Sequence, residues 1–305
     1  MAFEQLQHAR ALNLPSREAM LQRSPSVEYF WRNNKNLLSN AWAEWEMSKK
    51  DELVNLNQSL FDPNLRKAIR LAWEDPTKES AVKKLWHEVM PGVYQCQFFE
   101  PQRLTKLREY LEEVSNAQIP LRPPYGIVLN RGGMMLDSRS LGYLAAPSFQ
   151  AFYRDLIDQY MRPISRLLFP EIMGYDTQSF GFSIQYQPTT DTSIRPHTDA
   201  SAVTLNINLN LPGEEFSGSA VDFFNPVTGV KHELVFEPGT AVIHRGNVPH
   251  AAQPITSGER SNFVFWLYGK HGQIPANQTA KAIDKDDAQK RWSLSTTEHD
   301  DYSPF

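Results

Sequence analysis

The 305-residue sequence has one cysteine, Cys96, no long apolar run and no cluster of basic residues. With a single cysteine, no disulfide can form within the chain and no cysteine cluster can hold zinc. No stretch reaches the roughly 18 consecutive apolar residues that a membrane-spanning helix needs. The net charge of -4 and the lack of a basic cluster argue against a nucleic-acid partner. We therefore expect neither nucleic acid nor membrane as a partner.

The first ten residues, MAFEQLQHAR, lack a basic segment followed by an apolar core. We therefore expect no secretory signal, and the single cysteine agrees with a reducing compartment. The composition, 41% hydrophobic and 22% charged, is typical of a soluble globular protein. These features predict a cytoplasmic location, and they leave the oligomeric state open.

Residues 1–90 are expected to form an N-terminal helical region that packs on the core. Asp62-Pro63 has the pattern of a helix N-cap followed by a first-turn proline. Aromatic and aliphatic side chains recur at helical spacing on both sides of this point. They are Leu38, Trp42 and Trp45, then Leu65, Ile69 and Trp73. Stripes of this kind indicate core packing and not a cofactor site.

The apolar period changes to two at about residue 180. Phe180, Phe182, Ile184 and Tyr186 alternate with small or polar residues. Further short strands are expected at 203–209, 220–224, 233–236, 240–244 and 261–268, separated by turn signals. This spacing predicts a mainly β domain over 91–272, a jelly roll or barrel with flanking helices. Residues 273–305 are expected to form one helix near 279–292 and a loose tail.

A small set of residues predicts a metal site. His197-Thr198-Asp199 is followed by His250 and Arg260. Two imidazoles and one carboxylate form the facial triad that holds a non-haem Fe(II) and leaves coordination positions open. An arginine just beyond the last ligand supplies a forked cation for a carboxylate. The combination predicts an Fe(II)/2-oxoglutarate-dependent dioxygenase, with O2 as its second co-substrate.

Three alternatives stay open at this point. His244, six residues before His250, could replace it as the distal ligand, although the spacing to Arg260 favours His250. The same ligands could hold zinc in a metal-dependent hydrolase, but no carboxylate follows the motif at a fixed offset to act as general base. A non-catalytic metal-binding barrel is the third alternative, and the complete triad with Arg260 argues against it.

The strand after the H-x-D motif carries polar residues on one face. Thr204 and Asn206 alternate with large aliphatic residues. Parity separates the two faces but does not decide which one is inside a barrel. If the polar face is inside, Thr204 and Asn206 would lie near the metal as hydrogen-bond partners for a bound oxyacid.

Two segments resemble a known family. Residues 196–201, PHTDAS, and 204–210, TLNINLN, resemble the catalytic domain of procollagen lysyl hydroxylases. More broadly they resemble the prolyl and lysyl hydroxylase branch of the Fe(II)/2-oxoglutarate oxygenases. His250 followed by Gly258-Glu259-Arg260 is similar to that branch as well. The resemblance covers roughly residues 90–270, and it departs from the family at the usual glycine-rich stretch, which here contains only Gly218.

The resemblance implies a double-stranded β-helix that binds iron through His197, Asp199 and His250. It also implies that Arg260 pairs with the distal carboxylate of 2-oxoglutarate. Asn206 would line the co-substrate pocket, and Tyr186, on the strand before the motif, is a further pocket candidate.

The expected reaction oxidises an unactivated C–H bond, by hydroxylation or by desaturation or cyclisation. We expect an amino acid or an amino-acid-derived small molecule as substrate, with a peptidyl lysine or proline as the alternative. Residues 117–146 and the N-terminal helices are expected to form the pocket walls. Four loop arginines are candidates for binding a substrate carboxylate: Arg122, Arg131, Arg139 and Arg195.

Overall fold

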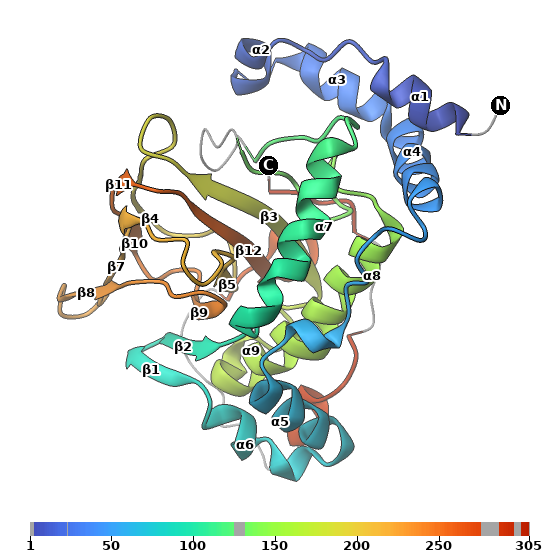
Figure 1. Ribbon diagram of the computed structural model, residues 1–305. Coiled ribbons are helices and arrows are strands. Elements are labelled where there is room, and N and C mark those ends of the chain that lie inside the picture. Colours follow the sequence, from blue (N-terminus) through green and yellow to red (C-terminus); the bar gives the residue numbers. More distant parts are fainter. Residues whose placement is uncertain (1–2, 23, 125–131, 276–286, 296–299, 305) are drawn as a thin grey trace.

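The computed structural model describes residues 3–22, 24–124, 132–275, 287–295 and 300–304. Two main antiparallel sheets form the jelly roll, and helices cover the outer face of the larger sheet (Figure 1). The predicted fold class is therefore confirmed. Among the described residues, no helix is both long enough and apolar enough to span a bilayer.

The larger sheet has the strand order β1-β2-β9-β5-β12-β3. Its strands are β1 (His87–Met90), β2 (Val93–Gln97), β3 (Gln178–Tyr186), β5 (Val203–Asn208), β9 (Thr240–Arg245) and β12 (Arg260–Tyr268). The smaller sheet has the order β4-β10-β7-β8. Its strands are β4 (Ile194–His197), β7 (Val221–Phe224), β8 (Lys231–Leu234) and β10 (His250–Ala252). A two-stranded ribbon joins β6 (Ser217–Gly218) to β11 (Ile255–Ser257).

Most helices come before β3, either ahead of β1 or between β2 and β3. They are α1 (Glu4–Arg10), α2 (Arg17–Leu21), α3 (Pro25–Asn33), α4 (Lys35–Ser48), α5 (Pro63–Glu74), α6 (Ser80–Lys83), α7 (Leu104–Asn116), α8 (Pro147–Asp155) and α9 (Arg162–Leu168). The predicted start of α5 is confirmed, because the Asp62 side chain accepts hydrogen bonds from the N–H groups of Asn64 and Leu65, each at 2.9 Å.

The helical segment that begins with α8 continues through Pro163 in α9. A π-helical segment, Leu156–Met161, joins α8 to α9. Proline lacks an N–H, so Pro163 cannot donate to the carbonyl of Gln159, its partner in a regular α-helix. The indole Nε1 of Trp73 on α5 donates to that carbonyl instead, at 3.0 Å. This bond satisfies the freed acceptor and ties α5 to the long helix.

The two faces of the larger sheet differ in their neighbours. The aliphatic side chains of β5 share one buried cluster with the helices, including Trp42 and Trp45 of α4. The polar side chains of β5 therefore face the lumen between the sheets. This decides which face of β5 lies inside the barrel, which the alternation of residues alone left open. The described parts of the N-terminal helices pack on this outer face and contribute no residue to the inner cluster of Phe180, Phe182 and Trp266, contrary to the expectation that they wall the pocket.

Two expected boundaries also need correction. The strand expected at 233–236 is β8, which lies two residues earlier. The expected C-terminal helix falls partly outside the described residues, and α10 (Asp287–Arg291) is its described part. Within the tail that is expected to be loose, Asp300 is buried and its side chain accepts from the N–H of His271 at 2.7 Å. The domain limits at residues 90 and 272 stay predictions.

Candidate metal centre

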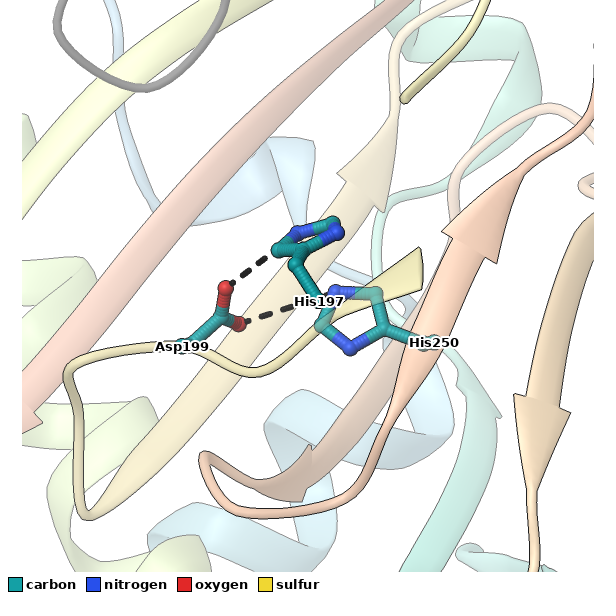
Figure 2. A group of neighbouring side chains, drawn as sticks. All are labelled: His197, Asp199 and His250. Atoms are coloured by element: carbon teal, nitrogen blue, oxygen red, sulfur yellow. Dashed lines mark ion pairs between the residues drawn. The ribbon is translucent and has the colours of Figure 1, made fainter. Parts of the chain in front are cut away.

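The two predicted histidine ligands are neighbours across a strand pair. His197 ends β4, His250 begins β10, and the two residues are direct partners in the antiparallel ladder. Asp199 lies in the turn before β5, where its N–H donates to the carbonyl of Gly246 at 2.8 Å. The three side chains turn toward one another (Figure 2). Their ligand atoms all lie within 4.8 Å of one another.

Hydrogen bonds to the Nδ1 atoms of His197 and His250 leave their Nε2 atoms free to bind a metal. The Nδ1 of His197 is 2.8 Å from the carbonyl of Arg195, and the Nδ1 of His250 is 3.0 Å from the carbonyl of Val248. A carbonyl only accepts, so each Nδ1 carries the proton and each Nε2 presents a lone pair. Burial lowers the pKa of His250, which favours the neutral form that a metal ligand needs.

Thr204 holds the carboxylate ligand in place. Its hydroxyl donates to Oδ2 of Asp199 at 2.6 Å, and it lies 2.9 Å from the hydroxyl of Ser201. Thr204 therefore lies near the metal centre as expected. Its single hydroxyl proton is used by Asp199, however, so it orients a ligand and is not available to donate to a bound oxyacid.

His244 lies beside the triad but outside the group of ligand atoms. It is buried on β9, where its Nδ1 is 2.9 Å from the carbonyl of Arg245. Its ring packs edge-on against His250, with 4.7 Å between the ring centroids. Burial lowers the pKa of His244 to about 4, so it is neutral at physiological pH. The choice of His250 over His244 as distal ligand agrees with this arrangement.

Arg260 is fully buried, with 0% of its surface exposed. None of its three guanidinium nitrogens has a hydrogen-bond partner among the described residues. The guanidinium lies over the ring of Tyr186, 4.2 Å from its centroid, and 5.3 Å from that of Phe236. Burial lowers the pKa of Arg260. A buried cation without a hydrogen-bond partner among the described residues is costly, which makes this a site suited to an anion.

The loop arginines are placed less favourably. Arg139 is held by Asp137 at 3.2 Å and by Gln178 at 3.0 Å, so its charge is already paired. Arg122 is buried, Arg195 is exposed on β4, and Arg131 lies outside the described residues. Sequence reasoning missed Asp137. This buried carboxylate also accepts from the hydroxyl of Tyr153 at 2.6 Å, and so fixes the segment after residue 132.

Comparison with known proteins agrees with this geometry. Residues 46–174 match the OGFOD2-like domain, and residues 174–268 match the 2OG-Fe(II) oxygenase superfamily. The second match contains His197, Asp199, His250 and Arg260. The chain belongs to the 2OG-Fe(II) oxygenase superfamily. This oxygenase therefore carries an iron-binding triad, and its dependence on 2-oxoglutarate follows from the family and the triad. The metal-hydrolase alternative is set aside.

Several known proteins are similar to this oxygenase. The Arabidopsis thaliana 2-oxoglutarate and iron-dependent oxygenase domain-containing protein ICU11 is 30% identical over 224 residues, 68% of this chain and 52% of the relative. Rattus norvegicus procollagen-lysine,2-oxoglutarate 5-dioxygenase 1 is 30% identical over 118 residues, 37% of this chain and 15% of the relative. A prolyl 4-hydroxylase structure from Phytophthora capsici aligns with a TM-score of 0.47 at 14% identity, covering 79% of this chain and 80% of that one.

The likeness to lysyl hydroxylases is thus confirmed, as a distant one. This oxygenase spans about half the length of the first curated relatives that it matches.

Proposed function

We propose that this oxygenase binds 2-oxoglutarate through Arg260 and oxidises an unactivated C–H bond of an amino acid or an amino-acid-derived small molecule. The observation that carries the first part is the state of Arg260. Its guanidinium is buried and unpartnered among the described residues, in the same lumen as the triad. A carboxylate would pair with two of its nitrogens and compensate its desolvation.

The residues of the chain have separable tasks in this reaction. Iron and 2-oxoglutarate, when bound, supply the oxidising chemistry, and the protein supplies binding and orientation. His197, Asp199 and His250 would hold the metal through three ligand atoms, the ligand set of a facial triad. Thr204 keeps the Asp199 carboxylate turned toward that centre. Tyr186 supports Arg260 by lying flat beneath its guanidinium.

The lining of the lumen supports a small substrate. Phe180, Phe182 and Trp266 are buried on its inner face and exclude water from it. Met135, from the segment between α7 and α8, packs in the same cluster and forms a β-bridge with Phe182. A lumen covered in this way suits an amino-acid-sized molecule better than a folded protein.

A peptidyl lysine or proline is the second candidate. The 118-residue likeness to a procollagen-lysine dioxygenase favours it. A side chain of an extended peptide could enter the same lumen. The two candidates then differ in whether the rest of a peptide lies outside the lumen.

A substrate screen separates these candidates. The purified protein with Fe(II) and 2-oxoglutarate would be offered free amino acids and, in parallel, the same residues within capped peptides. We expect free or small derivatives to stimulate succinate formation, with a matching mass change in the product. Stimulation by peptides alone would replace the small-molecule proposal. An absence of 2-oxoglutarate binding to the wild-type protein would overturn the role of Arg260.

A further inference from the structure

Four asparagine side chains form a continuous chain of amides between the two central strands. Asn206, Asn208 and Asn210 lie along β5 and just beyond it, and Asn262 lies on β12 opposite Asn208. Asn208, Asn210 and Asn262 are all at most 3% exposed, whereas Asn206 is half-buried. Buried amides must be paired, and here they are paired with one another.

The outer end of the chain is fixed by backbone groups on both sides of Arg260. Asn210 accepts from the N–H of Ser261 at 3.0 Å and donates through Nδ2 to the carbonyl of Glu259 at 2.7 Å. A backbone N–H can only donate and a carbonyl can only accept. The amide of Asn210 therefore has one permitted orientation.

The fixed orientation of Asn210 also fixes the orientation of the other amides in the asparagine chain. Asn208 accepts from the N–H of Asn210 at 3.1 Å, so its Nδ2 must face Asn210 and, at 3.5 Å, the Oδ1 of Asn262. The Nδ2 of Asn262 then donates to the Oδ1 of Asn206 at 2.6 Å. The Oδ1 of Asn206 is thus used as an acceptor, whereas its Nδ2 has no partner among the described residues. Reversing any one amide would place two donors or two acceptors against each other.

We propose that Asn262 is a positioning residue of the co-substrate pocket: it holds the Oδ1 of Asn206, so that the Nδ2 of Asn206 is left to donate to a carboxylate of bound 2-oxoglutarate. The inference rests on the proposed function. Asn206 lies two residues from Thr204, which contacts Asp199, and Asn262 lies two residues from Arg260. A ligand that extends from the metal centre to Arg260 passes between these points, along the polar face of β5.

The chain of asparagine amides also links two residues proposed to contact the same ligand, Arg260 and Asn206. Asn210 holds the peptide groups before and after Arg260, and Asn206 stands at the other end. The same hydrogen bonds therefore place the cation and orient the donor. A substitution in the middle of the chain should change co-substrate binding without touching the ligand.

The test is a double-mutant cycle measured as binding. Anaerobic calorimetry would follow 2-oxoglutarate binding to the Fe(II)-loaded full chain. Asn206→Ala should weaken binding about 10-fold, the loss expected for one hydrogen bond to a charged group. Asn262→Asp removes the Nδ2 donor, so Asn206 turns its own Nδ2 toward the new carboxylate and its oxygen toward the lumen. We expect at least the same loss.

The cycle separates positioning from charge repulsion. In the Asn206→Ala background, Asn262→Asp should cause little further loss, because the residue through which it acts is gone. A full further loss would mean that the new charge repels the ligand directly, and it would overturn the proposal. Unchanged binding by Asn206→Ala would overturn it as well.

Two controls complete the experiment. Asn262→Ser, whose hydroxyl is too short to reach Asn206, repeats the test without a new charge. Phe263→Leu perturbs the same strand from the helix-facing side and should leave 2-oxoglutarate binding within about 2-fold of the wild type. If Arg260→Lys weakens binding and the asparagine variants do not, the inference fails while the proposed function stands. If the wild type does not bind 2-oxoglutarate, both fail.

Discussion

His197 and His250 are direct partners on two antiparallel strands, although 52 positions separate them in the sequence. The strand pairing sets the distance between the two rings before any metal binds. Asp199 then needs only a short turn beyond β4 to complete the triad. This preformed geometry predicts that the loss of one ligand leaves a folded protein with a defective centre.

The first prediction concerns the ligands. His197→Ala, Asp199→Ala and His250→Ala should each abolish tight Fe(II) binding, because two ligands cannot define a face of the metal. His244→Asn should retain it, since the amide can still donate to the backbone carbonyl that Nδ1 of His244 contacts. Anaerobic calorimetry with Fe(II) measures both. Retained binding by His250→Ala together with loss in His244→Asn would reverse the assignment.

The second prediction concerns the anion site. Arg260→Lys keeps the charge but loses the planar fork, so 2-oxoglutarate binding should weaken by about 2–4 kcal/mol. Iron affinity should change little. The apparent Michaelis constant for 2-oxoglutarate and the Fe(II) dissociation constant give the two readouts. The exposed Arg195→Lys is the matched control, and an unchanged constant in Arg260→Lys would remove Arg260 from the site.

The third prediction concerns Thr204. Thr204→Val keeps the shape of the side chain but removes the hydroxyl that donates to Asp199. Iron affinity should fall about 10- to 100-fold, as for other residues that orient metal ligands. Thr204→Ser restores the hydroxyl and should recover most of the loss. Equal iron affinity in the valine and serine variants would contradict the assigned role.

The fourth prediction concerns the long helix. Trp73→Phe removes the indole that donates to the Gln159 carbonyl, so the free energy of unfolding should fall by about 1–2 kcal/mol beyond the loss of packing. Trp42→Phe is the control, because the Nε1 of Trp42 has no partner among the described residues. Urea denaturation measures both variants. If Trp73→Phe lowers the free energy of unfolding by no more than its loss of packing explains, the hydrogen bond does not contribute to stability.

The sequence predicted those parts of the fold that depend on local chemistry. The cap at Asp62, the stripes of α4 and α5 and the long alternating strands depend on short-range spacing, and so does the H-x-D motif. The strands β4 and β10 were missed because three or four residues carry no readable period. They are the strands that bring His197 and His250 together.

Other features depend on the tertiary structure. The continuation of the helix through Pro163 requires Trp73, a donor from another helix, which no local pattern predicts. Which face of β5 points inward depends on the helices, because they cover the aliphatic face. The order within the asparagine chain likewise depends on pairing between β5 and β12. The cytoplasmic location and the exclusion of nucleic-acid partners stay predictions from composition.

The position of β4 at the edge of its sheet has a consequence for stability. This strand has β10 as its single neighbour in the sheet, and their ladder is irregular. An ion held by His197, Asp199 and His250 would link the two strands across this irregular ladder. Removing it with a chelator should therefore accelerate amide hydrogen exchange in residues 194–199 while the core of the larger sheet stays protected. In this protein, metal content would set how firmly one edge of the barrel stays closed.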